Sequence, residues 1–254
     1  MRPPDFPDAF RTGTARRNVD DILKDIHWLG HAGLLLEGSP TIYIDPFNLE
    51  GSLPKADLIL ITHPHYDHCS PRDISRILKD DTAVVGPEDA LAKIPLEGIR
   101  CVPAAPHKPF HWNDVLISPL PAFSWNKPQH PASKNWLGFM LRWGGRWIYH
   151  AGDGNVIPRI PRRWLDAAFL PVDTGYSLIW SEGVVFAYEL AAGVSVPVHF
   201  GSICGPRSEA ERFVRSCVEE RGLNARMPVR WRGAEEDLPM PEKSGELSLR
   251  GAGS

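Results

Sequence analysis

Apolar residues occur along this chain in short runs that glycine, proline and polar residues separate. The first runs have the length of β-strands and cover 26–30, 33–37 and 41–46. The next run, ADLILIT at 56–62, is nearly continuous, which is typical of a strand buried on both faces. Ser70-Pro71 follows closely and predicts an N-cap with proline in the first turn, opening a helix over 72–80.

The alternation of strand and helix patterns continues to about residue 232. We expect further strands at 82–86, 99–105, 167–172, 194–200 and 228–232. We expect further helices at 88–94, 181–193 and 205–222. Turn residues at Asn113-Asp114 and Gly144-Gly145 predict two hairpins, and Ser208 with Glu211 predicts a capping box in the last helix.

This order of elements predicts an α+β domain in which two sheets pack together with helices outside them. The chain of 254 residues suits one large domain. We assign an N-terminal arm or short helix to 1–24, the domain to 25–233 and a polar, mobile tail to 234–254.

Composition narrows the classes of partner. The net charge of −3 predicts no steering toward nucleic acid or an anionic membrane surface. No N-terminal run reads as a signal peptide, and no apolar stretch of about 18 residues predicts a transmembrane helix. The four cysteines are scattered, which argues against a disulfide framework and favours a reduced cytoplasm. A small-molecule substrate is expected; oligomerisation is left open.

One loop crowds metal-binding side chains together. In THPHYDHCS, His63, His65, Asp67 and His68 occupy six positions directly after the buried run at 56–62. Such groups are costly to desolvate and pack poorly, so a polar surface loop is the simplest alternative. Imidazole and carboxylate groups are good ligands for zinc and similar divalent ions, and their density here favours a metal site.

Asp153 and His199 each follow a predicted strand, so separate strand ends can bring them to the same edge of the fold. Alone, Asp153 could be a turn residue between two glycines, and His199 a hydrogen-bonded histidine at a strand end. Zinc takes about four or five ligands, so these candidates exceed one ion. They fit two ions that share a bridging carboxylate.

The string H63-x-H65-x-D67-H68 resembles the signature of the metallo-β-lactamase superfamily. Matching pieces follow in order at 28–37, 44–47, 149–153 and 197–201, so the resemblance covers most of the chain. They are similar to the branch of ascorbate-6-phosphate lactonase, the N-acyl phosphatidylethanolamine phospholipase D group and other metal-dependent hydrolases. The resemblance implies a four-layer αβ/βα sandwich with two mixed sheets face to face.

The resemblance also implies the roles of the ligands. His63 and His65 would hold the first metal with a histidine from mid-chain. Asp67, His68 and His199 would hold the second, and Asp153 would bridge both ions. Many relatives place the mid-chain histidine where this chain has Phe123 or Ser124. We assign it to His130, in preference to His107 and His111, which we expect on the far side of a strand.

Two smaller departures concern neighbours of the ligands. Gly154 stands where the family usually has threonine, and Phe200-Gly201-Ser202 replaces Tyr-Gly-Thr. Both are expected to change hydrogen bonds around the ligands rather than ligation. Asp45 could orient a ligand histidine or cap the following turn.

These features predict a dinuclear metal-dependent hydrolase in which a metal-bridging hydroxide attacks a lactone, ester or phosphodiester. Zinc is the default metal, with manganese or iron as alternatives. Asp67 would orient the nucleophile and relay its proton. His31 or His150 would donate a proton to the leaving group; a structural partner for a backbone carbonyl is the alternative for each.

Two other classes of function stay open. The superfamily includes di-iron redox enzymes, whose usual motif has glutamate at the position of His65 and which add a flavin domain. A metal-binding protein without turnover is the other. Trp125, Trp136 and Trp180 are expected to line the site or the core, and Cys69 is expected to pack beside the ligands.

Overall fold

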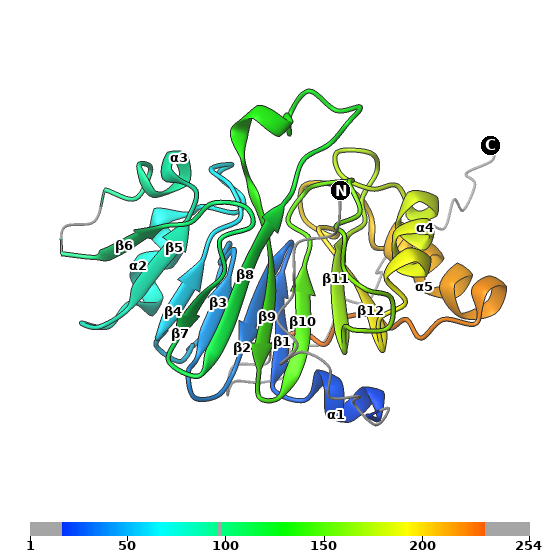
Figure 1. The fold of residues 1–254 in the computed structure, drawn as a ribbon, viewed down its shortest axis with the longest axis horizontal. Helices are drawn as coiled ribbons and strands as arrows, with labels where there is room; N and C mark the ends of the chain where they lie inside the picture. The colour runs from blue at the N-terminus through cyan, green and yellow to red at the C-terminus, as the bar shows by residue number, and fades with distance from the viewer. Residues whose placement is uncertain (1–16, 96–97, 232–254) are drawn as a thin grey trace, which may run out of the picture.

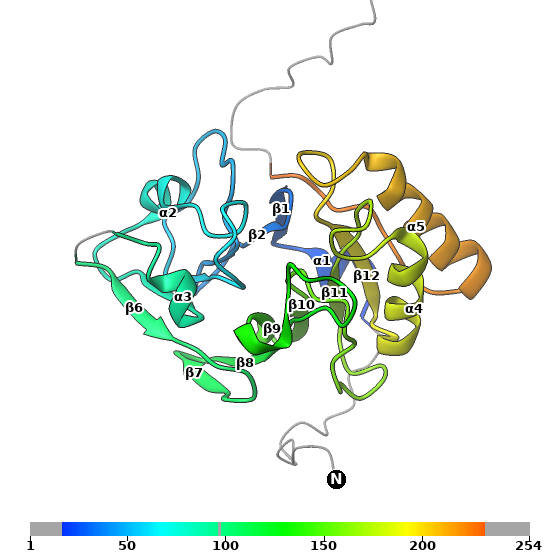
Figure 2. The same ribbon diagram turned by 90° about the horizontal axis from the view of Figure 1, so that it is seen from above.

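The predicted four-layer sandwich is the architecture of the molecule. The computed structural model describes residues 17–95 and 98–231. Within these ranges, one six-stranded sheet has the order β1-β2-β3-β4-β5-β6 and the other β12-β11-β10-β9-β8-β7. Seen from above, helices α2 and α3 lie outside the first sheet, and α4 and α5 lie outside the second (Figure 2).

The first half of the chain builds the first sheet. Its elements are α1 (Val19–Leu23), β1 (Ile26–Gly30), β2 (Gly33–Leu36), β3 (Ile42–Ile44), β4 (Leu58–Leu60), α2 (Pro71–Ile77), β5 (Ala83–Gly86), α3 (Glu88–Leu91) and β6 (Arg100–Pro103). Strands β1 to β3 pair antiparallel, and β3 to β6 pair parallel. This sheet is therefore mixed, as predicted.

The second half builds the other sheet. Its elements are β7 (Phe110–Trp112), β8 (Val115–Pro121), the 3-10 helix η2 (Ala132–Lys134), β9 (Leu137–Trp143), β10 (Arg146–His150), β11 (Ala167–Pro171), α4 (Trp180–Leu190), β12 (Val194–Val198) and α5 (Arg207–Arg221). Both predicted hairpins are present, because β7 pairs with β8 and β9 with β10 in antiparallel fashion.

Three apolar clusters fill the spaces between the four layers. The largest lies between the sheets and includes Leu34, Leu60 and Phe139, all fully buried. The second joins the outer face of the second sheet to α4 and α5 through Phe186 and Phe213. A third cluster lies between the first sheet and α2. Burial on both faces explains the unbroken apolar run predicted as the strand at 56–62.

Most boundaries follow the sequence patterns, with two exceptions. Ser70 caps α2 as expected, because its side chain accepts a hydrogen bond from the Asp73 N–H. The capping box in the last helix is wrong: α5 begins at Arg207, directly after Pro206, so Ser208 already lies inside the helix. Glu211 instead accepts a hydrogen bond from the Arg207 guanidinium at 2.7 Å.

The strand predicted at 228–232 is also wrong within the described residues. There the chain lies beside β1, with the Trp28 N–H donating to Val229 O and the Trp231 N–H donating to Trp28 O, both at 2.8 Å. Only an isolated bridge between Trp28 and Arg230 results. Pro228 has no N–H, which limits pairing along this edge.

The two ends of the predicted domain organisation lie partly outside the described residues. Of the expected arm at 1–24, residues 1–16 lie outside, and the rest includes α1. The expected tail at 234–254 lies outside entirely. Among the helices of the described ranges, none has the length and apolarity to cross a bilayer.

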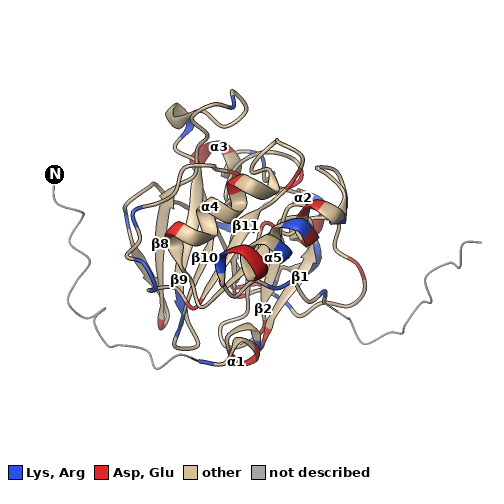
Figure 3. Cartoon of the chain, turned by 90° about the vertical axis from the view of Figure 1, so that its right-hand side faces the viewer, with Lys and Arg blue, Asp and Glu red and all other residues tan. Residues whose placement is uncertain are grey.

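Surface charge shows no field of one sign over the outer helices. In the view that faces them, α5 carries both acidic and basic residues, whereas the charged residues of α4 are acidic (Figure 3). Several are paired, for example Arg212 with Glu209 at 3.4 Å. This face therefore offers no basic footprint of the kind that binds a nucleic-acid backbone.

Candidate metal centre

The candidate ligands follow strands that end at one edge of the molecule. Strands β10, β11 and β12 run parallel, and β8 runs in the same direction because both β8 and β10 pair antiparallel with β9. The loops after these strands gather at the upper edge in Figure 1, where the loop after β8 rises highest. Side chains from distant parts of the chain therefore meet at this edge.

Three histidines form the first group. His63 Nε2 lies 3.1 Å from His65 Nδ1. The ring centroid of His130 lies 5.1 Å from that of His63 and 5.0 Å from that of His65. One nitrogen of each residue lies within 4.8 Å of the others, so a single ion can reach all three. The ring of buried Trp136 packs against His63, His65 and His130 and forms one wall of the group.

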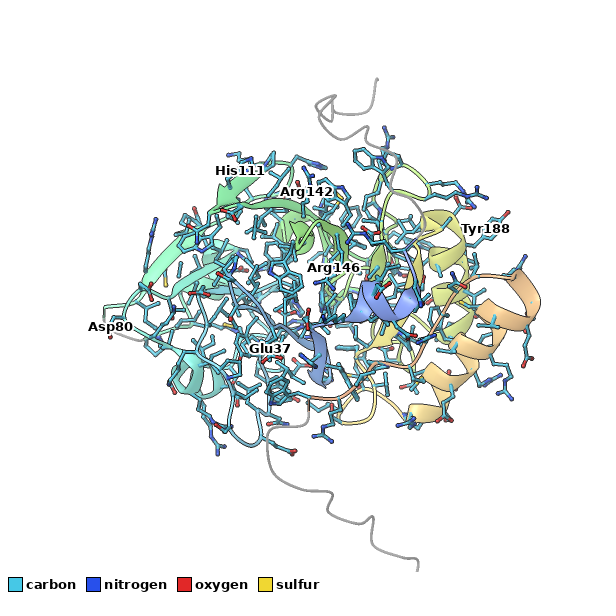
Figure 4. The ribbon with its side chains drawn as sticks, turned by 90° about the horizontal axis from the view of Figure 1, so that it is seen from below. Glu37, Asp80, His111, Arg142, Arg146 and Tyr188 are labelled. Carbon is cyan, nitrogen blue, oxygen red and sulfur yellow. The ribbon has the colours of Figure 1, made fainter. Side chains whose placement is uncertain are left out.

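The loop after β8 explains how His130 reaches the cluster from its late position in the sequence. The Ser124 N–H donates to His130 O at 2.8 Å, so the loop returns to the end of β8, where the resemblance implied a ligand histidine. His107 and His111 are exposed and belong to no group of the described residues that could hold a metal. Figure 4 shows His111 at the outer margin of the molecule.

Asp153 lies at the centre of the cluster. Its Oδ2 is 3.1 Å from His199 Nε2 and 3.2 Å from His68 Nε2, which makes the second group. The same oxygen is 3.7 Å from His63 Nε2 and 3.6 Å from His130 Nε2 in the first group. One carboxylate oxygen thus faces imidazoles of both groups.

Hydrogen bonds orient the ligand nitrogens of His63 and His68. His68 Nδ1 lies 2.8 Å from Asp45 Oδ2 and donates to it. The Thr62 hydroxyl donates to the same Asp45 oxygen at 2.6 Å. Because its hydrogen is used there, the hydroxyl oxygen accepts the hydrogen bond from His63 Nδ1, at 2.9 Å. Both histidines therefore present Nε2 to the cluster. For Asp45, the orienting role is the one that the hydrogen bonds favour.

Asp173 plays the same part for His199 and was not among the residues that the sequence singled out. Its Oδ2 accepts from His199 Nδ1 at 2.8 Å, and the N–H groups of Gly175 and Ser177 hold the carboxylate in place. A signal was available, because Asp173 closely follows the predicted strand at 167–172, as Asp45 follows an earlier one.

Asp67 pairs with His31 at the side of the second group. Asp67 Oδ2 lies 2.9 Å from His31 Nε2, and 3.9 Å from His68 Nε2. Burial opposes the charge of Asp67, but the hydrogen bond to His31 and the charge of His68 lower its pKa to about 2. His31 Nδ1 lies 3.0 Å from the hydroxyl of Ser202, a residue of the Phe-Gly-Ser departure.

His150 takes the structural alternative. Its Nε2 donates to Ala32 O at 2.8 Å, and its Nδ1 accepts from the Gly152 N–H at 3.1 Å. Both nitrogens are committed to the backbone and the side chain is fully buried. This geometry leaves His150 no free nitrogen for the predicted proton donation. The His150 side chain instead ties the loop before Asp153 to the first sheet.

Three residues at the same edge have backbone in the left-handed region. His31, Asp45 and His199 have φ of 50°, 46° and 70°, a region that residues with a Cβ seldom adopt. The His199 N–H donates to His31 O at 2.7 Å, which holds two of these strained residues together. Strain of this kind persists where surrounding structure enforces it, and it is concentrated at functional sites.

The donors are suited to a cation. His130 Nδ1 and Nε2 and Asp153 Oδ1 are buried and find no hydrogen-bond partner among the described residues. Burial lowers the pKa of His130 to about 4, so this imidazole is neutral at pH 7 with a lone pair available. Despite burial, Asp153 and Asp45 raise the pKa of His68 to about 10. The carboxylates therefore stabilise positive charge here, and metal ions can supply it in place of protons.

Gly154 is required by packing. A Cβ at this position would lie 2.7 Å from Phe123 N and 2.8 Å from Ala122 C. The loop is held there by the Asn155 N–H, which donates to Phe123 O at 3.1 Å. The threonine that the resemblance implied cannot occupy this position unless the backbone moves.

The remaining residues singled out from the sequence have varied surroundings. Trp125 is exposed, and Trp180 is half-buried beneath the guanidinium of Arg212, which lies 4.7 Å from its ring centroid. Cys69 is buried, and its thiol donates to Ala90 O at 3.5 Å, as expected for a packed neighbour of the ligands.

Solved structures with the same fold include a metallo hydrolase from Ignicoccus hospitalis, with a TM-score of 0.63 and 19% identity over 82% of this chain and 95% of that one. CmlA, a diiron beta-hydroxylase from Streptomyces venezuelae, aligns with a TM-score of 0.64 and 15% identity over 81% of this chain and 52% of its own. At these identities the likeness shows the fold alone.

Sequence relatives are nearer. A UPF0173 metal-dependent hydrolase of Methanoculleus marisnigri is 29% identical over 86% of this chain and 98% of its own length. A protein of the same name from Thermoplasma acidophilum is 28% identical over 74% of this chain and 88% of its own. The family model of the beta-lactamase superfamily domain matches residues 32–200, more than half of the chain. The chain therefore belongs to the β-lactamase superfamily.

Proposed function

We propose that this metal-dependent hydrolase of the β-lactamase superfamily holds two divalent metal ions and cleaves a lactone, ester or phosphodiester. The position of Asp153 carries the proposal. Its Oδ2 lies between 3.1 and 3.7 Å from four imidazole nitrogens that belong to two groups. A carboxylate in that position can be shared by two ions, as dinuclear hydrolase sites require.

The proposed ligand sets follow from the two groups. His63, His65 and His130 would hold one ion; Asp67, His68 and His199 would hold the other, with Asp153 shared. For Asp67 this requires a modest shift, because its Oδ2 lies 3.9 Å from His68 Nε2. The motifs at 28–37 and 44–47 support placing the chain in the lactonase-like and phospholipase-D-like branch.

Two ions in this site would supply Lewis acidity, lowering the pKa of a water and polarising the substrate oxygen. Zinc suits the first group best, because its donors are all imidazoles. The chain supplies the orientation of the donors through Asp45, Asp173 and Thr62. It also supplies a site for the proton that the reaction moves.

The Asp67–His31 pair is the site that can hold the proton moved in the reaction. Asp67 Oδ2 and His31 Nε2 are 2.9 Å apart, so a proton accepted by the carboxylate can be shared with the imidazole. His31 also lines a cavity of about 220 Å³, with Trp28, Phe47 and Phe200 among its walls. We assign His31 the delivery of a proton toward this cavity through its Nδ1, which lies 3.0 Å from the hydroxyl of Ser202, another residue that lines the cavity.

Exposed apolar side chains on the ligand-bearing loops favour a substrate with an apolar part. Trp125 is 77% exposed, Tyr66 65%, Tyr176 55% and Ile203 46%. Tyr66 lies between two proposed ligands in sequence, and its ring packs 5.9 Å from that of Phe47, measured between centroids. An ester or lactone with an apolar group fits these exposed apolar side chains better than a highly charged substrate does.

Metal content per chain tests the proposal. Native protein, His130→Ala and the matched control His111→Ala are analysed for metals after loading with zinc. We expect about two ions in native protein and in the control, and about one in His130→Ala. One ion or none in native protein, unchanged by His130→Ala, would exclude the dinuclear site.

The same samples separate the other two functions. A panel of a lactone, a carboxylic ester and a phosphodiester is assayed with the two-metal protein. Turnover of at least one substrate, lost in His130→Ala, supports the hydrolase. Bound metal without turnover of any substrate would favour the non-catalytic protein. Iron as the metal of protein purified without zinc loading would favour the redox enzyme.

A further inference from the structure

A buried cysteine lies beside the second group of proposed ligands. Cys204 is 6% exposed. With His31, Asp67 and His199 it forms a set of four buried residues, each offering one ligand atom, and these atoms all lie within 4.8 Å of one another. Cys204 belongs to neither of the two proposed ligand sets.

The loop after β12 places Cys204 there. The Gly201 N–H donates to Gly205 O at 2.8 Å, which folds the loop after His199 back on itself. The Thr174 N–H donates to Cys204 O at 3.1 Å and fixes the backbone of the cysteine from the neighbouring loop. Gly205 has a φ of 138°, and a Cβ there would lie 2.9 Å from Thr174 Cγ2. The thiol is therefore held near His199 by the fold.

The other cysteines have different surroundings. Cys69 donates to Ala90 O, Cys217 lies in the apolar cluster beneath α5, and Cys101 is exposed. Among the described residues, Cys204 alone of the four cysteines belongs to a group able to hold a metal. Cys204 therefore differs from the other two buried cysteines because it lies among side chains that can bind a metal.

A second observation points to unused ligand capacity in the neighbouring group of His68, Asp153 and His199, which shares His199 with the set around Cys204. Asp153 Oδ2 is 3.1 Å from His199 Nε2, yet Asp153 Oδ1 is buried and has no hydrogen-bond partner among the described residues. Asp67 is closer to His31 than to His68, so the set Asp67, His68 and His199 is the looser of the two. A further donor on the Asp67 side would complete it.

We propose that Cys204 is a thiolate ligand of the second metal ion, together with Asp67 and His199. The inference rests on the proposed dinuclear function and deepens it. When the ion binds, the metal–sulfur bond replaces the S–H bond and the thiol proton leaves to solvent. His31 keeps its hydrogen bond to Asp67. A soft sulfur donor makes this ion site selective for zinc over manganese, which prefers oxygen ligands.

Cobalt-substituted protein tests the assignment. Full-length Cys101→Ser, which lacks the exposed thiol, serves as the parent protein. The parent, its Cys204→Ser variant and its control variant Cys217→Ala are loaded with Co²⁺, and their metal content is measured. We expect a thiolate-to-cobalt charge-transfer band in the near ultraviolet for the parent and the control, and its loss in Cys204→Ser. The affinity of Cys204→Ser for the second ion should fall by at least the roughly 10–100-fold that loss of an outer hydrogen-bond partner costs.

A measurement on unmutated protein covers the case in which Cys204→Ser does not fold. X-ray absorption at the zinc edge should show one sulfur neighbour per two zinc ions at about 2.3 Å. Two bound ions without a charge-transfer band and without a sulfur neighbour would overturn the role of Cys204 and leave the dinuclear hydrolase standing. Fewer than two ions in wild type would overturn both.

Discussion

Asp45→Asn is the substitution that separates orientation of a ligand from ligation itself. Asp45 is fully buried and accepts from three donors: the Thr62 N–H at 2.8 Å, the Thr62 hydroxyl at 2.6 Å and His68 Nδ1 at 2.8 Å. Asparagine has nearly the same shape, so packing is preserved. It offers only one acceptor oxygen, and its amide group must face at least one of these donors.

The structure sets the size of the effect. If the asparagine oxygen faces His68, the buried Thr62 N–H loses its acceptor, which costs about 1–3 kcal/mol. The bond from His68 also loses its charged partner, and charge-assisted bonds contribute about 1.5–3 kcal/mol. We therefore expect the free energy of unfolding to fall by about 3–5 kcal/mol. The affinity for the ion at His68 should fall about 10–100-fold, because the imidazole is no longer oriented.

Urea unfolding of metal-free protein and zinc titration measure the two effects. With a slope of about 3 kcal/mol per M, the midpoint should fall by about 1–1.7 M. Asp81→Asn is the control, because the side chain of Asp81 is 78% exposed and the same substitution there should stay within about 0.5 kcal/mol. A wild-type midpoint and wild-type zinc affinity in Asp45→Asn would refute the orienting role.

Three further outcomes are expected. In metal-free protein, burial lowers the pKa of His130 from the usual 6.5 to about 4, so the folded state binds fewer protons than the unfolded state below pH 6.5. The free energy of unfolding should therefore fall by about 3 kcal/mol as the pH falls from 6.5 to 4. Urea midpoints of His130→Gln should lack this part of the pH dependence. Gly154→Thr should lower the thermal midpoint and the metal content together, since its Cβ meets the backbone at 122–123; an unchanged melting curve would contradict this. Arg146→Met removes donors to the carbonyls of Ile22 and Lys24 near α1, on the lower side of the molecule that Figure 4 shows. The free energy of unfolding should therefore fall by about 1–3 kcal/mol, while the zinc content stays at the wild-type value.

The pattern of residues determined much of the fold because its signals are local. Period-two and continuous apolar runs, with turn residues between them, place nearly every strand within a few residues. The cap at Ser70 and the two hairpins depend on neighbouring residues only. The capping box at Ser208 failed because the helix begins earlier, at Arg207 directly after Pro206. The strand at 228–232 failed because pairing there depends on β1, which is distant in sequence.

For the site, the sequence alone identified the dense string from His63 to His68, because ligands within one loop must be close. It also indicated Asp153 and His199, since both follow strands. Only the tertiary structure placed His130, rather than His111, beside His63, through a loop that closes on Ser124. It also brought Asp173 to His199 and Cys204 to Asp67, and it committed both nitrogens of His150 to the backbone. These contacts depend on strand order and on where each loop closes, which neighbouring residues do not encode.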